Sequence, residues 1–370
     1  MKDSRVYILG AGCSYDQNTG YPLASGFIQS LTAFATKISA DPQKQRTLKA
    51  VQDTIDLLTR CQSGAFYAST VDQMINLVLK HQCDGDLAAI ANVNNPSTSQ
   101  IDHLRMEAVR KAKVATAACF LDMEQGVRNR LIPRYRNFIE HKIFHNSGQS
   151  ESTLSRLRKS DARVLTFNYD RMFELAFFAT AADSFLQNYY AYGTEVLNSG
   201  LEVTGEIAGV AADRFCFIKL HGSIGFLCNE DAFGQRVYQI TDAAKWSPIP
   251  ILDAHFFSDQ PTRHAFRDPM IVFPFEKDFV RKNPGNKFDF RAYINTAWDH
   301  AAKVIQEATE IWVIGYSFDP TDCKYLIDLL REARNCGSLV IQNPNECDHI
   351  EQLLIHDGIK IPLKKNPSPF

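Results

Sequence analysis

The sequence predicts an α/β fold with a doubly wound parallel sheet and a large helical insertion after the first strand. Short apolar, β-branched runs alternate with segments of helical periodicity, as in sheets whose parallel strands are joined by helices. The chain has 370 residues, of which 45% are hydrophobic and 22% charged. This composition is that of a globular protein with enough apolar material for a sizeable core. We expect a single domain over residues 1–370.

The first strand is expected at Arg5–Leu9, an apolar run that leads at once into Gly10, Ala11 and Gly12. An apolar run without alternation is typical of a strand that is buried on both faces of a parallel sheet. The glycines after it predict a tight turn.

Helical periodicity then dominates residues 27–143, and we assign residues 28–150 as a helical insertion within the domain. The periodicity breaks over residues 84–100, where Asn-Asn-Pro-Ser at 94–97 predicts a loop. This helical segment is a candidate surface for assembly or gating, or alternatively only a structural cap.

The remaining elements follow in alternation. Strands are expected at 163–167, 214–220, 310–314 and 338–342, and helices at 290–308 and 322–333. Residues 226–290 are rich in Pro, Asp and Phe and lack a clean period, which predicts an irregular insertion near the site. The Lys- and Pro-containing tail at 364–369 is expected to be frayed.

Five of the expected strands end in small or polar residues. These are Gly10, Asn168, His221, Gly315 and Asn343. In open α/β sheets, ligands bind outside the carboxyl ends of the strands. The sequence therefore predicts that these residues line one crevice.

The first motif is the turn of Gly10, Ala11, Gly12, Cys13 and Ser14, followed by Gly-Tyr-Pro ending at Pro22. Two glycines after a strand let backbone amides approach a diphosphate, and the Ser14 hydroxyl adds a donor. A tight turn without a ligand is the alternative. The third glycine of the dinucleotide fingerprint is missing, which counts against an ordinary dehydrogenase.

The second motif runs from Thr166 through Asn168 to Asp170. A carboxamide and a carboxylate two residues apart can hold a ribose and a nicotinamide amide, and Asn168 could orient an attacking water. Alternatively, these side chains cap the next helix.

The third motif is His221 followed by Gly222, directly after an apolar run. Because imidazole titrates near neutrality, His221 can act as a base toward a ribose hydroxyl or a water. A structural histidine with satisfied hydrogen bonds is the alternative.

Two further strand ends carry polar candidates. Ser317, two residues after Gly315, could donate to a phosphate, or the segment could be a plain turn capped by Asp319. Asn343 could bind an adenosine ribose or make an Asx turn ahead of Pro344.

Taken in this order, the motifs resemble those of the sirtuin superfamily, whose members bind NAD on a Rossmann-like fold and cleave its glycosidic bond. The resemblance implies a nicotinamide pocket at Asn168 and Asp170 and a catalytic role for His221. It implies cofactor contacts at Gly10, Ala11, Gly12, Ser14, Pro22, Thr166, Gly315, Ser317 and Asn343.

The chain departs from the protein-deacylating sirtuins in two ways. Its nine cysteines form no Cys-x-x-Cys pair, so no structural zinc is expected. The Phe-Arg that follows the proline in deacylases is absent, since Leu23 follows Pro22. What remains resembles the sirtuin-like branch of bacterial anti-phage systems, which implies an NAD glycohydrolase that depletes NAD in abortive infection.

The remaining expectations concern location and partners. No signal peptide or spanning segment is evident, so a soluble cytoplasmic protein is expected. The net charge of −2 does not indicate nucleic-acid binding. Self-assembly into a homo-oligomer, or a separate activating protein, would trigger the enzyme. The alternatives are a non-catalytic sensor of NAD or ADP-ribose and a deacylase that lacks the zinc module.

Overall fold

The computed structural model describes residues 4–15, 21–64, 66–145, 148, 151, 155–156, 159–180, 216–231, 234–239, 256–257, 268–276, 290–318 and 323–370. Within them, a six-stranded sheet has the order β3-β2-β1-β7-β8-β9, and every neighbouring pair of strands is parallel. The strands are β1 (Arg5–Leu9), β2 (Ala162–Thr166), β3 (Cys216–Lys219), β7 (Glu310–Ile314), β8 (Ser338–Gln342) and β9 (Leu363–Asn366).

Numbered by appearance within this sheet, the strands run 3-2-1-4-5-6, which is the order of a doubly wound Rossmann-like fold. The order reverses between β1 and β7, so this pair is the topological switch point of the sheet. The predicted fold class is confirmed, and the five strands expected around the sheet begin and end within two residues of their predicted bounds.

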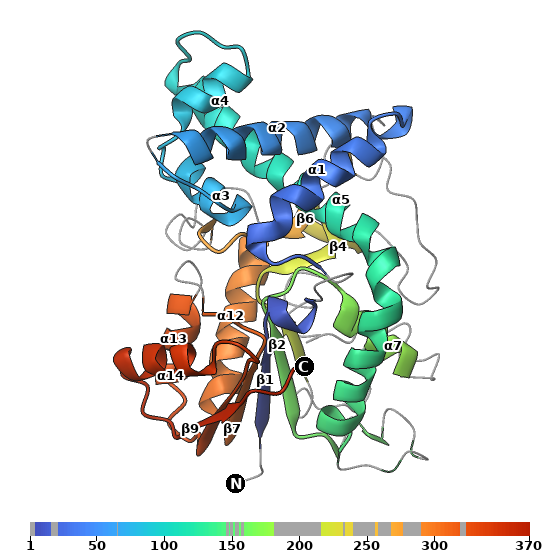
Figure 1. Ribbon diagram of the computed structural model, residues 1–370, viewed down its shortest axis with the longest axis vertical. Helices are drawn as coiled ribbons and strands as arrows, with labels where there is room; N and C mark the ends of the chain where they lie inside the picture. The colour runs from blue at the N-terminus through green and yellow to red at the C-terminus, as the bar shows by residue number, and fades with distance from the viewer. Residues whose placement is uncertain are drawn as a thin grey trace.

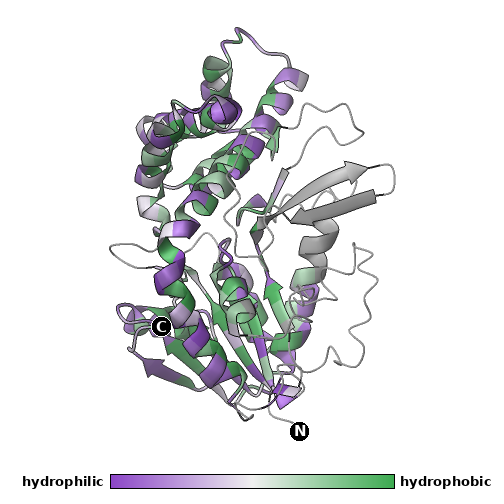
Figure 2. Cartoon of the chain, turned by 90° about the vertical axis from the view of Figure 1, so that its right-hand side faces the viewer, coloured by the Kyte–Doolittle hydropathy of each residue, from purple (hydrophilic) through white to green (hydrophobic). Residues whose placement is uncertain are grey.

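Helices cover both faces of the sheet, as Figure 1 shows. Val6 and Ile8 of β1 share a core with α12 (Phe290–Gln306), α13 (Cys323–Arg331) and α14 (Cys347–His356). Tyr7 and Leu9 share a core on the other face with α7 (Met172–Thr180) and with the end of α5. Burial on both faces explains why the strands read as continuous apolar runs. In Figure 2, the sheet strands carry mostly hydrophobic residues, whereas the helices mix both kinds.

The large helical region predicted after the first strand is present and has a core of its own. It comprises α1 (Phe27–Ile38), α2 (Gln45–Ser63), α3 (Val71–Leu79), α4 (Asp84–Ile90) and α5 (Thr98–Phe138). The predicted break over 84–100 is wrong in its first half, because α4 is helical and begins with two acidic residues that suit a helix N-terminus. Ser97 and Gln100 form a capping box that starts α5 after the predicted loop.

The 41-residue α5 joins the two parts of the molecule. Its first half packs against α1, α2, α3 and α4, and it also packs against α7 beside the sheet. A π-helical turn at Ile139–Ile143 follows its end.

A second, antiparallel sheet has the order β5-β4-β6, formed by β4 (Gly222–Asp231), β5 (Gly234–Gln239) and β6 (Asp268–Ile271). Part of the predicted irregular insertion at 226–290 is therefore a regular hairpin, and most of its other residues lie outside the described ones. The backbone N–H of Val272 donates to the carbonyl oxygen of His221 across 3.0 Å, which joins this sheet to the end of β3.

The expectation of a frayed tail at 364–369 is wrong, because β9 pairs with β8 as the edge strand of the main sheet. Lysines are well tolerated on edge strands, and Lys365 lies 2.9 Å from both Asp348 and Glu351 of α14. The terminal Phe370 packs its ring 4.9 Å from that of Tyr135. None of the described helices is long and apolar enough to cross a membrane.

Candidate functional site

The turns after β1 and β7 lie in direct backbone contact at the switch point. Gly12 donates its N–H to the carbonyl oxygen of Gly315 across 2.7 Å. A Cβ on Gly10 would lie 2.5 Å from the Cα of Tyr316, and Gly315 has a φ of +61°. These three positions require glycine because no side chain fits between the two turns.

Four of the five amides of the first turn, those of Gly10, Gly12, Cys13 and Ser14, already have acceptors within the chain. The N–H groups of Gly10 and Gly12 donate to Ile314 and Gly315, and those of Cys13 and Ser14 donate back to Gly10 and Ala11. The turn nevertheless presents an outer side, since Ala11 is exposed and Gly12 and Pro22 are half-buried. Contact between this side and a diphosphate stays a prediction.

Asn168 is held at the end of β2 by both its backbone and its side chain. Its Nδ2 donates to the carbonyl oxygen of Gly10 across 3.0 Å and reaches the Ser14 Oγ at 3.5 Å. Its N–H donates to the Thr166 Oγ1, which in turn donates to the carbonyl oxygen of Leu9. Thr166 thus orients Asn168 from within the sheet.

The other side-chain atom of Asn168, Oδ1, is buried and accepts no hydrogen bond from the described residues. Most buried polar atoms in native proteins have a partner, so this oxygen is open to a donor that the described residues do not supply. A water molecule or a ligand group would meet this requirement.

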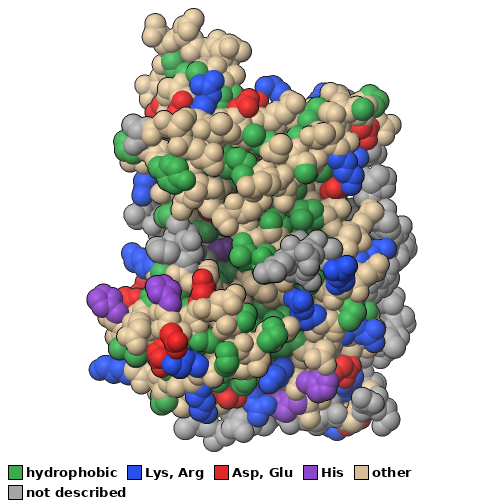
Figure 3. Space-filling view, in the orientation of Figure 1, with side chains coloured by type: hydrophobic (Ala, Val, Ile, Leu, Met, Phe, Trp, Pro, Cys, Tyr) green, Lys and Arg blue, Asp and Glu red, His purple; other side chains and the backbone are tan. Residues whose placement is uncertain are grey.

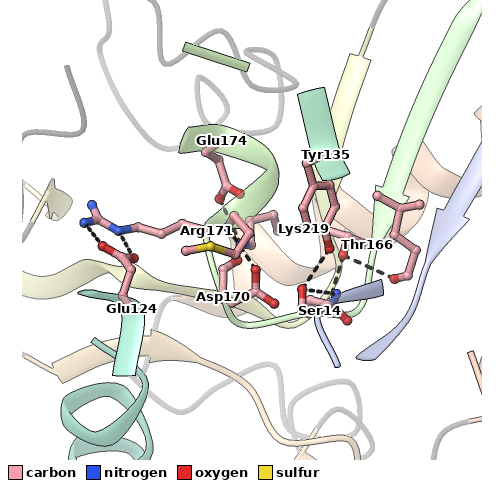
Figure 4. Close-up of polar contacts among 11 residues, drawn as sticks. Ser14, Glu124, Tyr135, Thr166, Asp170, Arg171, Glu174 and Lys219 are labelled. Carbon is pink, nitrogen blue, oxygen red and sulfur yellow. Dashed lines mark hydrogen bonds and ion pairs between the residues drawn. The ribbon is translucent and has the colours of Figure 1, made fainter. Parts of the chain in front are cut away.

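Asp170 caps the N-terminus of α7, which is the alternative interpretation given above for the motif from Thr166 to Asp170. Its Oδ1 accepts from the N–H of Met172 across 2.9 Å. Burial raises the pKa of Asp170, and the charge of the nearby Lys219 opposes this shift. Lys219 also donates to the carbonyl oxygen of Asp170 and, across 2.8 Å, to Glu174. Figure 4 shows Asp170 with its neighbours Arg171 and Glu174.

His221 is buried at the end of β3, beside the segment that carries Asn168. Its ring lies 5.2 Å from that of Phe167, edge to face, and 5.9 Å from that of Tyr169. Phe167 and Tyr169 are the two neighbours of Asn168 in the chain, so the predicted carboxamide and imidazole lie on adjacent strand ends. Figure 3 shows a hollow between the helical region and the sheet, with hydrophobic side chains and a histidine at its bottom.

The segments after β7 and β8 carry the remaining candidate ligand-binding residues. Ser317 is exposed, whereas Asp319 and Asp322 lie outside the described residues. The Asn343 Oδ1 accepts from the N–H groups of Asn345 and Glu346, which is the Asx turn that the sequence allows. Contacts of Ser317 and Asn343 with a ligand stay predictions.

The sequence analysis missed the charged and phenolic groups beneath these strand ends. Arg171 and Glu124 form a buried pair with two contacts of 2.6 Å. The Tyr135 hydroxyl of α5 lies 2.8 Å from the Ser14 Oγ. Lys219 gave a usable signal, since a lysine within an apolar strand needs a buried partner. Glu124 and Tyr135 gave none, because nothing in a helical repeat tells which polar residue faces a distant strand end.

Among the described residues, no group of three or more His, Cys, Asp or Glu side chains is placed to hold a metal ion.

Comparisons with known proteins do not assign the chain to a family. No protein-family model and no curated protein sequence matches it. Among solved structures, it is similar to Sir2Tm, determined bound to a propionylated peptide, with 14% sequence identity and a TM-score of 0.34. That alignment covers 99% of this chain and 88% of the other. A similarity of this size assigns neither a family nor an activity.

Proposed function

We propose that the protein is an NAD glycohydrolase that cleaves NAD to nicotinamide and ADP-ribose. The observation that carries the proposal is the anchored Asn168, whose buried Oδ1 lacks a donor among the described residues and whose two neighbours contact the ring of His221. This group lies on the strand ends next to the switch point of a doubly wound sheet, the usual place for a dinucleotide.

The proposed binding mode follows the order of the strand ends. The diphosphate lies against the outer side of the turn from Gly10 to Ser14, with the exposed Ser317 as a further donor. The nicotinamide end lies over β2 and β3, where Asn168, Asp170 and His221 are. The adenosine ribose lies toward Asn343 at the end of β8.

In the proposed reaction, the bond between the nicotinamide nitrogen and the ribose C1′ breaks, and its electron pair leaves with nicotinamide. Positive charge builds on the ribose, and a water attacks C1′. The Oδ1 of Asn168 accepts a hydrogen bond from this water, and His221 accepts the proton that the water loses. The aromatic rings around His221 keep bulk water away, which strengthens the electrostatic interactions in the site.

Asp170 is proposed to hold the carboxamide of nicotinamide. A carboxamide offers both a donor and an acceptor, and a carboxyl group can match it in either protonation state. Because burial raises the pKa of Asp170, the carboxyl is easier to protonate than an exposed aspartate. The hydrogen bond from Met172 fixes its Oδ1 in place.

The biological role that we propose is that of a cytoplasmic anti-phage effector, on the ground of the motif resemblance. Uncontrolled NAD hydrolysis would kill the host, so the resting activity should be low. Self-assembly through the helical region, or a separate activating protein, is the proposed trigger.

The test is a product analysis with purified protein and NAD. We expect nicotinamide and ADP-ribose in equal amounts without any peptide. Release that requires an acetylated peptide would instead identify a deacylase. Binding of ADP-ribose by calorimetry without release, also at high protein concentration, would identify a sensor. Either of these results would overturn the glycohydrolase proposal.

A further inference from the structure

The helix α5 brings two polar side chains from the helical region to the strand ends. Its Glu124 and Tyr135 are buried, and they are separated by three turns of helix. Glu124 holds Arg171, the residue after Asp170. Tyr135 contacts Ser14, in the turn after β1. The helix therefore contacts the segment that carries Asn168, through Arg171, and the turn that its side chain reaches, through Ser14.

Through Ser14, the hydroxyl of Tyr135 is connected to the side chain of Asn168. The Tyr135 hydroxyl and the Ser14 Oγ are 2.8 Å apart, and the Ser14 Oγ is 3.5 Å from the Asn168 Nδ2. Tyr135 is 1% exposed and Ser14 is 2% exposed, so water does not replace either partner. Figure 4 shows the hydrogen bond between Tyr135 and Ser14.

The Tyr135 hydroxyl helps to set the direction in which the Ser14 hydroxyl points. A serine hydroxyl has one proton and can turn freely, so its direction is set by the groups around it. Around Ser14 these groups are Tyr135, Asn168 and Asp170, which is also hydrogen-bonded to Ser14. Removing the Tyr135 hydroxyl would take away one of these three groups, so the direction of the Ser14 hydroxyl beside the Nδ2 of Asn168 would change.

We propose that Tyr135 is a positioning residue through which the helical region sets the orientation of the Asn168 carboxamide. Tyr135 does not touch the reacting atoms. Its hydroxyl interacts with Ser14 and with the side chain of Asn168, and Ser14 and the Gly10 carbonyl hold Asn168 in turn. A displacement of α5 by a partner bound to the helical region would therefore change turnover without any new residue entering the site. The kinetic part of this proposal rests on the glycohydrolase function proposed above.

The variant is Tyr135→Phe, and the matched control is Tyr7→Phe. Tyr7 is as buried as Tyr135 and packs against the same helix through Phe138, with ring centroids 5.3 Å apart. Its hydroxyl interacts with Arg5 at the opposite end of β1. Both variants lose one buried hydroxyl next to α5, and only one of them changes the neighbours of Ser14.

The first readout does not depend on activity. In protein labelled with ¹⁵N-asparagine, the side-chain signals of Asn168 are identified by their loss in Asn168→Ala. We expect Tyr135→Phe to shift these two signals and Tyr7→Phe to leave them in place. Unchanged signals in Tyr135→Phe would overturn the proposal, whether or not the protein hydrolyses NAD.

The second readout is kinetic and applies to the active enzyme. We expect Tyr135→Phe to lower kcat about 10- to 100-fold, as for a slightly misplaced catalytic group, with KM within about twofold of the wild type. Tyr7→Phe should retain the wild-type kcat. An unchanged kcat in Tyr135→Phe, or an equal loss in both variants, would contradict the proposal. An inactive wild type would refute only the glycohydrolase function, and the asparagine signals would then decide the positioning role.

Discussion

The side chain of Asn168 donates a hydrogen bond to the backbone carbonyl of Gly10 across 3.0 Å. This bond joins the end of β2 to the turn at the switch point of the sheet. It also fixes which way the carboxamide faces, because turning it over would place Oδ1 against another carbonyl oxygen. The Oδ1 of Asn168, which has no donor among the residues that the structure describes, is therefore held in a defined direction.

Replacing Asn168 by Asp tests this bond through stability. The new carboxylate would lie against the Gly10 carbonyl, so at pH 7 we expect the free energy of unfolding to fall by about 2–4 kcal/mol. Asn335 is the control, since its amide also donates to a backbone carbonyl, that of Gln306, but at the surface. Asn335→Asp should cost less than about 1 kcal/mol. Denaturant unfolding measures both, and equal costs would rule out a buried amide-carbonyl bond at Asn168.

The glycines at the switch point give a second prediction. Gly10→Ala and Gly315→Ala would each force Cβ into the backbone of the opposite turn, so each should cost about 3 kcal/mol or more. Gly126 lies exposed within α5, and a Cβ added there would meet nothing within 4 Å. Gly126→Ala should therefore stabilise the protein by about 0.5–1 kcal/mol. Thermal unfolding of the three variants is the measurement, and a stable Gly10→Ala would mean that the turns are not in contact.

A buried ion pair between Lys113 of α5 and Glu276 gives a third prediction. The two charges are 2.6 Å apart and almost fully buried, and Glu276 also accepts from the N–H of Phe273. Lys113→Met should lower the free energy of unfolding by about 3–5 kcal/mol because it leaves a buried carboxylate unpaired. Adding Glu276→Gln should recover part of this loss. The exposed Lys37, which pairs with Asp122, is the control.

Lys37→Met should cost less than about 1 kcal/mol, since exposed pairs contribute little. The comparison uses urea unfolding of the wild type and the three variants under one set of conditions. If Lys113→Met and Lys37→Met cost the same, the pair is not buried in solution.

The pH dependence of stability gives a fourth prediction. Burial raises the pKa of Glu174 above its ordinary value of 4.5. Between 4.5 and the raised value, the folded protein binds more protons than the unfolded chain, so the free energy of unfolding falls as pH rises. Glu174→Gln removes this titration. The wild type should therefore lose stability relative to the variant as pH rises above 4.5.

Glu151 should behave in the opposite way. Its hydrogen bond with Lys159 is the largest of the interactions that lower its pKa to about 2, so its contribution is present above 4.5 and lost as pH falls toward 2. The wild type should gain stability relative to Glu151→Gln as pH rises through that window. Chemical unfolding at steps of pH measures both differences, and the same sign for both variants would contradict the assignment.

Much of the fold could be predicted because buried parallel strands leave a strong local signal. The runs that became β1, β7 and β8 are mostly apolar, and a small or polar residue follows each of them. β9 left no such signal, because an edge strand can be polar and its pairing depends on β8. The hairpin of β4 and β5 was missed for a similar reason, since its strands lack a clean alternation.

The sequence could predict that some candidate residues lie close together, but not their hydrogen bonds. Asn168, Asp170 and His221 follow adjacent strands of one parallel sheet, and their contacts with a ligand stay predictions. That Asp170 caps α7 could not be separated from a ligand role by sequence alone, since both need the same carboxylate. Tyr135 comes from a helix that reaches the site from the insertion, a relationship that only the folded chain reveals.

The most direct test of the proposed function is nicotinamide release from NAD by the wild type, Asn168→Ala, His221→Ala and the surface control Asn335→Ala. The wild type and the control should release nicotinamide at equal rates. Each site variant should be at least about 100-fold slower while still unfolding cooperatively, because each loses a group that acts on the attacking water. Full activity in both site variants would contradict the proposed site and its mechanism.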